Sequence, residues 1–167
     1  TPEQFDSFVF GLHSRVRSHS WNMFLLGEAR SDVLGGIPFG GEATQGMERF
    51  PYNTLNAENP GISGFGDLYQ NINQMNLFIS RTLHTDVLTE SARNYYLGQV
   101  YGLRAYYMYQ LYRSWGDVVF TEEPSLGFEV GKLAKAATPA AEIFELVKND
   151  IESSLSYFGS DYTIKEK

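Results

Sequence analysis

Cysteine is absent from the sequence and histidine is scarce, which removes several kinds of chemistry at once. Without cysteine the chain has no disulfides, no thiolate metal ligands and no cysteine nucleophile. The histidines are His13, His19 and His84, and the first two lack the three- or four-residue spacing of a helical zinc pair. We therefore predict no metal site and no cofactor, and histidines that face solvent or cap helices.

The sequence also has few positively charged residues and no long apolar runs. The chain has 13 Lys and Arg against 20 Asp and Glu, a net charge of −7 and a pI of about 4.9. A nucleic-acid partner is therefore not expected, because affinity for phosphates needs a basic surface. A membrane-spanning helix needs about 20 consecutive apolar residues, and the sequence has no such run.

Aromatic residues, in contrast, are abundant. They make up 15% of the chain, as 12 Phe, 11 Tyr and 2 Trp, within an apolar fraction of 43% and a charged fraction of 20%. These fractions are ordinary for a globular protein, and 167 residues are enough to bury a sizeable core. The composition therefore predicts a single domain over residues 1–167.

The stretch from Ala92 to Trp115 is apolar on two helical faces, which predicts a central helix buried between neighbours. Arg104 lies within this apolar surface, and a lone buried charge costs several kcal/mol. We expect its guanidinium to join helices by bonding backbone carbonyls or a carboxylate. Gly116 then ends the helix and residues 117–120 continue as extended chain. The two faces comprise Tyr96, Val100, Leu103, Tyr107 and Leu111, and Leu97, Tyr101, Met108, Tyr112 and Trp115.

Three further helices are predicted from the same period. The first runs from a capping box at Thr1 to about His19, with a bend and a further turn over residues 21–26. The second covers about 66–83, and the last begins with Thr138 as N-cap and Pro139 as first helical residue. Its expected buried stripe comprises Ile143, Leu146, Val147, Ile151, Leu155 and Phe158.

Between Gly35 and Gly66 the helical period disappears, and the segment is rich in glycine and contains three prolines. A loop of about thirty residues within a compact domain is uncommon and, when ordered, is usually functional. Sugar rings present apolar C–H faces surrounded by hydroxyls, so carbohydrate sites combine exposed aromatic rings with amide or charged groups. The candidate ligand-binding residues are Tyr52, Asn53, Asn56, Phe39 and Phe65.

The loop aromatics have a second interpretation, in which they only attach the loop to the helices. Both interpretations stay open for Tyr52, and attachment is favoured for the phenylalanines. No catalytic constellation stands out: Gly61–Gly64 is a near miss for a serine nucleophile elbow, and the carboxylates at 117, 122 and 123 suit a solvated connection.

Several segments carry a family resemblance. Residues 103–107 (LRAYY) and 115–118 (WGDV) resemble the core signature of the SusD/RagB family of Bacteroidetes outer-membrane lipoproteins. The segments 28–32, 66–76 and 142–155 resemble further family patterns in the same order, while Val119 replaces the usual proline. The matches extend over the whole chain but over only about the first third of a typical member. The matching structural signature comprises Arg104, Tyr107, Trp115, Gly116 and Asp117.

The resemblance implies an all-α fold, a tetratricopeptide-like helical array with a long irregular loop. It also implies a cell-surface protein, not an enzyme, that binds oligosaccharides and delivers them to a SusC-like TonB-dependent transporter. Such a protein is held at the outer membrane by a lipid anchor that is not in this chain. The alternative is a tetratricopeptide-type protein-interaction module without its own sugar site.

Overall fold

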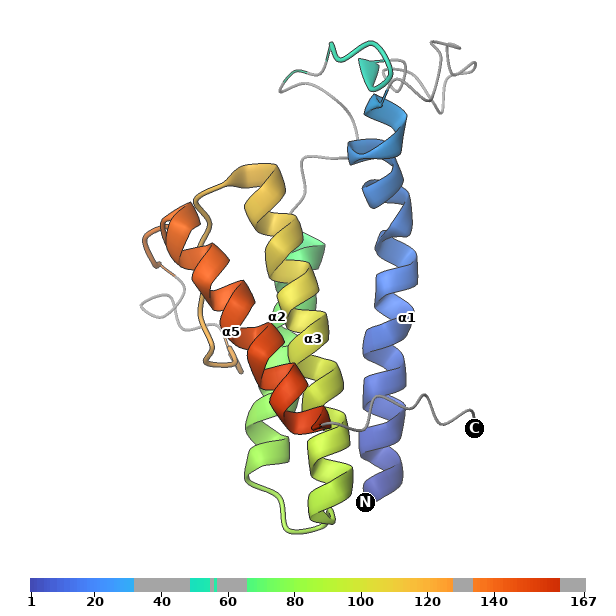
Figure 1. Cartoon of the computed structure of the whole chain (residues 1–167), viewed down its shortest axis with the longest axis vertical. Helices are drawn as coiled ribbons and strands as arrows, with labels where there is room; N and C mark the ends of the chain where they lie inside the picture. The colour runs from blue at the N-terminus through green and yellow to red at the C-terminus, as the bar shows by residue number, and fades with distance from the viewer. Residues whose placement is uncertain (32–48, 55, 57–65, 128–133, 160–167) are drawn as a thin grey trace. The chain divides into compact units, whose positions relative to one another are not determined.

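The structure is a computed structural model that describes residues 1–31, 49–54, 56, 66–127 and 134–159. Over these residues it is helical, without β-strands, and its one isolated bridge pairs Val118 with Thr138 in antiparallel fashion (Figure 1). The predicted all-α class is therefore confirmed. The elements are α1 (Pro2–Leu26), the 3-10 helix η1 (Glu28–Arg30), α2 (Gly66–Leu83), α3 (Glu90–Trp115) and α5 (Ala140–Phe158).

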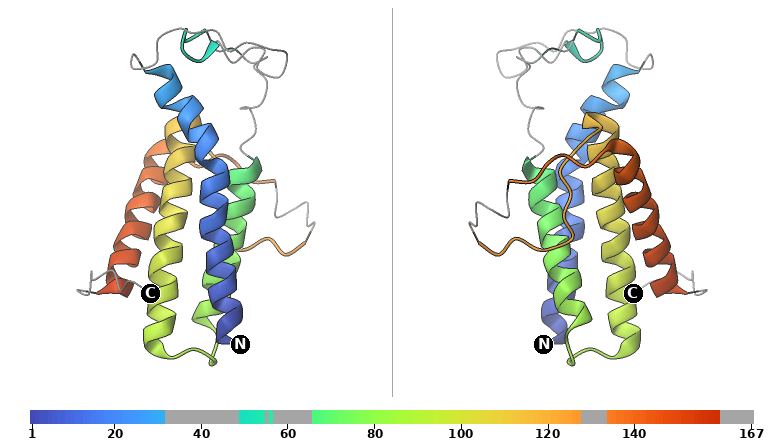
Figure 2. Two further views of the ribbon diagram at one scale, coloured as in Figure 1. Left: turned by 90° about the vertical axis from the view of Figure 1, so that its right-hand side faces the viewer. Right: turned by 90° about the vertical axis from the view of Figure 1, so that its left-hand side faces the viewer.

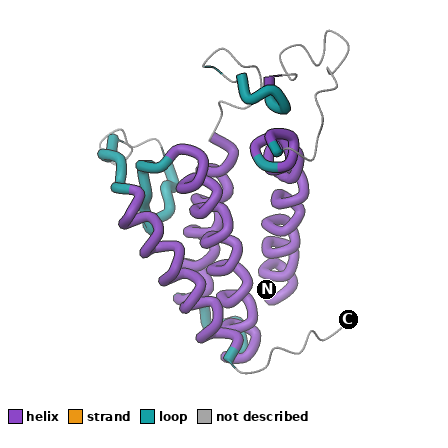
Figure 3. Tube along the Cα trace, turned by 45° about the horizontal axis from the view of Figure 1, so that its top comes forward, coloured by secondary structure: helices purple, strands orange, loops and turns teal. Residues whose placement is uncertain are grey.

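The chain divides into two compact units, and the boundary lies within α1. The first, here called the helical unit, contains Thr1–His13 and Asp67–Lys167, and the second contains Ser14–Gly66. In the helical unit α2, α3 and α5 run side by side, as the different views show (Figures 2 and 3). The prediction of a single domain over residues 1–167 stays a prediction.

Helix α3 occupies the centre of the helical unit, as its two apolar faces predict. Its N-terminus is capped by Thr89, whose hydroxyl accepts a hydrogen bond from the Ala92 amide at 3.2 Å. Its C-terminus is Gly116, with φ of 72° and its amide bonded to the Tyr112 carbonyl. Positive φ favours glycine, so the predicted helix end is confirmed.

An aromatic cluster attaches the first turns of α1 to α2 and α3. The Phe5 ring lies 5.6 Å from the Phe78 ring and 6.1 Å from the Tyr96 ring, measured between centroids. The Tyr96 hydroxyl donates to the Asp6 carboxylate at 2.8 Å. Burial, and then this hydrogen bond, raises the pKa of Tyr96 to about 12. The hydroxyl therefore stays protonated and keeps donating throughout the neutral pH range.

Helices α3 and α5 approach closely because glycine on α3 faces small or flat side chains on α5. A Cβ atom at Gly98 would lie only 2.9 Å from the Phe158 ring. The Ser154 hydroxyl reaches the Gly98 carbonyl at 2.6 Å and would lie 3.2 Å from a Cβ at Gly102. A larger residue at Gly98 would therefore displace the Phe158 ring.

This close approach corrects the predicted buried face of α5. Ile151 and Leu155, which were expected in the core, are 45% and 48% exposed. The buried positions include two polar residues, Asp150 and Ser154, because their partners on α3 are a guanidinium and a backbone carbonyl. The residues of α5 that are buried are Ile143, Val147, Asp150 and Ser154.

The predicted ends of two helices also need correction. Helix α1 is one continuous helix through Leu26, because no proline or glycine interrupts residues 12–26 and Gly27 follows. At α5, Pro139 rather than Thr138 is the N-cap, and it makes no side-chain capping bond. The cap comes from a distant residue: the Asp117 carboxylate accepts from the Ala140 amide at 2.8 Å. A carboxylate at this position also interacts favourably with the helix dipole.

We expect Asp117→Ala to destabilise the chain by about 1 kcal/mol, the usual cost of losing an N-cap side chain. Asp117→Asn should recover most of this loss, since the amide oxygen can still accept from Ala140. Urea denaturation followed by circular dichroism measures both variants. Equal losses in Asn and Ala would mean that the charge matters and the hydrogen bond does not.

Candidate functional site

A buried network around Arg104 connects three helices. Its Nε and Nη2 atoms each donate to the Asp150 carboxylate of α5 at 2.7 Å, a bidentate pair. Its Nη1 donates to the Asn76 side-chain oxygen of α2 at 2.9 Å. Arg104, Asp150 and Asn76 are 3%, 5% and 2% exposed. Arg104 was expected to join helices by bonding backbone carbonyls or a carboxylate, and the structure shows the carboxylate.

The surroundings of Arg104 keep its guanidinium charged. Burial alone would lower its pKa, but the hydrogen bonds and charge of Asp150, with the charge of Glu122, outweigh burial and raise it. Glu122 lies 3.5 Å from Nη2 and is itself 68% exposed. The guanidinium also lies 5.1 Å from the Tyr101 ring centroid and 5.9 Å from that of Phe120. Aromatic faces stabilise a cation that has lost its water.

One side of α2 holds the segment 117–127 by its backbone. The Asn76 amide group donates to the Thr121 carbonyl at 2.6 Å, and the Tyr69 hydroxyl donates to the Val119 carbonyl at 2.8 Å. Asn73 bonds Ser125 twice, donating to its carbonyl at 3.1 Å and accepting from its amide at 2.7 Å. Tyr69, Asn73 and Asn76 follow helical spacing, so a single face of α2 makes all four bonds.

The other residues of the structural signature lie in the interior or at helix ends. The Tyr107 side chain is fully buried, and its hydroxyl accepts from the Asn71 amide group at 3.3 Å. Trp115 is partly buried at the end of α3, followed by Gly116 and the capping Asp117. The contacts of Tyr107, Gly116 and Asp117 hold helices in place.

The described part of the predicted loop forms a turn attached by Phe50. The Phe50 side chain is 1% exposed and packs with Leu25 and Ala29. The turn is closed by the amides of Asn53 and Thr54, which donate to the carbonyls of residues 50 and 49 at 3.0 and 2.9 Å. Attachment by a phenylalanine was expected for the loop, and Phe50 has this role.

Two of the central candidate residues, Tyr52 and Asn53, lie on this turn, and Asn56 comes after it in the chain. Tyr52 is 53% exposed, and Asn53 has a positive φ of 52°. The Asn53 side chain accepts from Arg30 Nε at 3.1 Å, and the Asn56 side chain accepts from Arg49 at 3.0 Å. These bonds hold the Asn53 side chain to Arg30 and the Asn56 side chain to Arg49. The candidates Phe39 and Phe65 lie outside the described residues.

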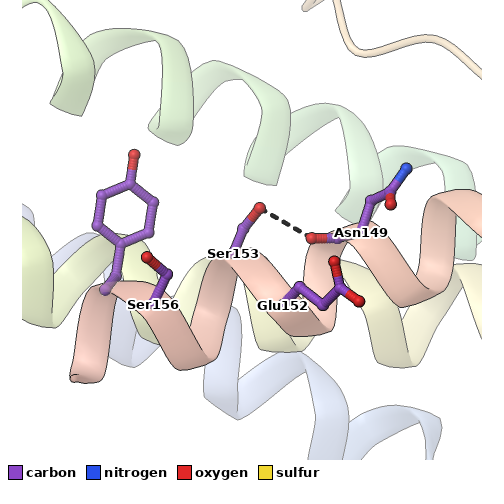
Figure 4. A pocket seen from close by; sticks show the side chains of 5 residues that line it. Asn149, Glu152, Ser153 and Ser156 are labelled. Atoms are coloured by element: carbon purple, nitrogen blue, oxygen red, sulfur yellow. Dashed lines mark hydrogen bonds between the residues drawn. The ribbon is translucent and has the colours of Figure 1, made fainter. Parts of the chain in front are cut away.

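A second polar surface, which sequence reasoning missed, lies on α5. It is a shallow depression with a volume of about 410 Å³, and all the lining residues that can be described belong to this helix (Figure 4). A signal was present, because these residues recur at spacings of three and four and therefore share a helix face. The lining residues are Asn149, Glu152, Ser153, Ser156 and Tyr157.

The histidines take no part in these surfaces. His13 is exposed and lies 3.0 Å from the Gln99 side-chain oxygen, while His84 bonds the Ser80 carbonyl at 2.7 Å. His19 is buried, so its expected exposure was wrong. Within the described residues no group of His, Cys, Asp and Glu could hold a metal ion. None of the helices in this part of the chain has the length and apolarity to span a membrane.

Helices packed in this way form an array of the tetratricopeptide-like type. NanU of B. fragilis shares 52% sequence identity with the chain at a TM-score of 0.86, and the match covers 99% of this chain and 32% of that one. A SusD superfamily protein from Bacteroides vulgatus is 51% identical at a TM-score of 0.84, and the match covers 97% of this chain and 32% of that one. The chain is therefore SusD-like, and spans about a third of the length of these proteins.

Other comparisons agree with this result. SusD-like protein P38 of Formosa agariphila is 36% identical over 74 residues, which are 42% of this chain and 14% of that protein. A laminarin-binding SusD-like protein and surface glycan-binding protein A of Bacteroides fluxus share the fold, at TM-scores of 0.75 and 0.71 and identities of 17% and 19%. The match to the laminarin-binding protein covers 93% of this chain and 34% of that protein, and the match to the Bacteroides fluxus protein covers 92% and 33%. No family model matches the chain.

We expect Arg104→Ala to destabilise the helical unit by about 3 kcal/mol, because it leaves the buried Asp150 carboxylate without its partner. Thermal and denaturant midpoints measure the loss. Glu122→Ala is the matched control: it removes the exposed carboxylate near the same guanidinium and should change the midpoint little. Similar losses in the two variants would show that the buried pair is not the stabilising contact.

We expect Phe50→Ala to open the turn at 49–54 by removing its buried attachment, at a cost of about 3 kcal/mol. The amides of Asn53 and Thr54 should lose protection in hydrogen exchange, while those of α3 keep it. Val87→Ala, at an apolar position that is 55% exposed, serves as control. Unchanged protection of the turn in Phe50→Ala would contradict the attachment.

Proposed function

We propose that the chain is part of a cell-surface protein that binds glycans and passes them to a SusC-like TonB-dependent transporter. The observation that supports this proposal is the likeness to SusD superfamily structures over nearly the whole chain. Members of the same fold carry glycan or laminarin binding in their names. The proposal includes an outer-membrane location through a lipid anchor.

The turn at 49–54, together with Asn56, is the proposed glycan contact within this chain. An exposed tyrosine ring can stack on the apolar face of a sugar, and amide groups can bond its hydroxyls. Tyr52 and Asn53 stand next to each other on a turn that Phe50 holds in place. Because the turn is already ordered, binding costs less conformational entropy than it would in a loose linker.

Binding rather than catalysis is the proposed role. A glycosidase needs two carboxyl groups on either side of the scissile bond, with the acid held protonated by its surroundings. The buried Asp150 is occupied by a bidentate guanidinium instead, and Glu122 is largely exposed. This arrangement of carboxylates supports a structural role for the first and a solvated state for the second.

An interaction module without its own sugar site is the second candidate, favoured by one specific observation. The outer side of α5 exposes Phe144, Ile151 and Leu155 by 41%, 45% and 48%. Exposed apolar side chains at helical spacing are typical of surfaces that contact another protein segment. The two candidates differ in one testable property, which is glycan binding by the chain itself.

We expect the chain to bind oligosaccharides weakly, with a Kd in the range of about millimolar to micromolar, because sugars offer little apolar area. Tyr52→Ala should weaken binding at least about tenfold, the cost of losing a stacking contact of about 1.4 kcal/mol. Isothermal titration against plant and host oligosaccharides measures this effect.

Tyr95→Ala is the matched control for that titration. Tyr95 is 54% exposed, close to the value for Tyr52, but lies on α3 in the helical unit. Equal affinity of wild type and Tyr52→Ala would contradict the assignment of the turn. No binding by wild type would favour the interaction module.

A further inference from the structure

The exposed surface of α5 has two flanks of opposite character. Because an α-helix turns about 100° per residue, residues 149, 152, 153 and 156 lie on one side of the buried face and residues 144, 151 and 155 on the other. The first flank carries an amide, a carboxylate and two hydroxyls, and the second carries apolar side chains. Tyr157 lines the same depression as the polar flank.

The Tyr157 ring is held in place from the protein side. It stacks on the Tyr101 ring with centroids 5.7 Å apart and an angle of 15° between the planes. Tyr101 in turn lies over the Arg104 guanidinium, which Asp150 holds with two hydrogen bonds. A ring supported in this way loses little side-chain freedom when a ligand stacks on it.

The polar groups of the depression suit hydroxyl-rich ligands. The Asn149 amide group both donates and accepts, the Glu152 carboxylate accepts, and the serine hydroxyls do both. The Ser153 hydroxyl donates to the Asn149 carbonyl at 2.8 Å, which leaves its lone pairs as acceptors (Figure 4). The volume of about 410 Å³ lies within the usual range of about 300–1,000 Å³ for small-ligand sites.

The charges near this depression favour neutral ligands. Glu152 lines it, and Glu122, which is 68% exposed, lies 3.5 Å from the Arg104 guanidinium. The positive charge of Arg104 is buried and compensated by Asp150. The nearby Lys148 pairs with Glu145 at 2.6 Å. Among the described residues, a carboxylate-bearing sugar would therefore meet the negative charge of Glu152, while Arg104 and Lys148 are already paired with carboxylates.

We propose that the polar flank of α5 is a second glycan-contact surface, which takes neutral oligosaccharides by stacking on Tyr157 and bonding Asn149 and Glu152. This inference rests on the proposed function only for the class of ligand. It is independent of the turn at 49–54, because the two surfaces belong to different units of the chain.

Two-dimensional NMR of the ¹⁵N-labelled 167-residue chain, titrated with neutral gluco- and xylo-oligosaccharides, tests the inference. Amide shifts of residues 149–157 should change in a saturable manner. Tyr157→Ala should raise the Kd for these shifts at least about tenfold. The double variant Asn149→Ala/Glu152→Ala should do the same and leaves the ring pair intact. Phe144→Ala, on the opposite flank, is the matched control and should leave the Kd unchanged.

Each outcome decides between the two glycan surfaces. Saturable shifts on α5 that the double variant abolishes support the inference, and a tenfold weaker response to oligogalacturonate supports its charge preference. Shifts confined to residues 49–56 overturn the inference and leave the proposed turn site standing. No saturable shifts anywhere overturn both surfaces in this chain. Equal affinity in the double variant and wild type also overturns the second surface.

Discussion

The Arg104 guanidinium lies in the interior of the helical unit and joins α3 to α5 through Asp150 and to α2 through Asn76. A buried charge is stable only while its partners remain, so the three helices must keep one relative placement. Asn76 also fixes the position of the segment 117–127, because its amide group donates to the Thr121 carbonyl. The segment that begins at Asp117 then caps α5. The polar contacts therefore form a closed circuit through α3, α2, the segment 117–127 and α5.

This circuit separates the structural residues from those available for binding. The side chains of Arg104 and Tyr107 are buried in contacts within the helical unit, and neither exposes a polar group for a ligand. The proposed ligand contacts lie instead on surfaces that are attached to rigid elements. Tyr52 lies on a turn fastened by Phe50, and Tyr157 is backed by Tyr101. Rigid attachment is what a weak ligand such as a sugar requires, since it provides little energy to order its own site.

Much of the fold follows from the sequence, because helical periodicity, glycine ends and the cost of a buried charge are local signals. They correctly predicted α2, α3 and the pairing of Arg104. The errors arose where burial or capping depends on a residue far away in the sequence. Ile151 was expected inside instead of Asp150, since only the position of Arg104 shows that a carboxylate belongs there. The capping of α5 by Asp117 depends on a contact across 23 residues, which periodicity does not report.

The candidate sites were less predictable than the fold. Tyr52 and Asn53 were recognisable from residue type, but their placement depends on Phe50, whose burial against Leu25 and Ala29 is a tertiary contact. The polar flank of α5 was hidden because a run of serine, asparagine and glutamate on a helix is typical of plain solvated surface. Its distinguishing feature, the ring pair with Tyr101, exists only once α3 and α5 are packed.

A double-mutant cycle at Arg104 and Asp150 tests the central claim, that one buried pair holds the helices together. The cycle compares Arg104→Met, Asp150→Leu and the double variant by urea denaturation. Each single change leaves an unpaired buried group, whereas the double change replaces the pair with apolar side chains. We predict a coupling free energy of at least about 2 kcal/mol, with the double variant more stable than the sum of the single losses implies. Additive losses would contradict the claim.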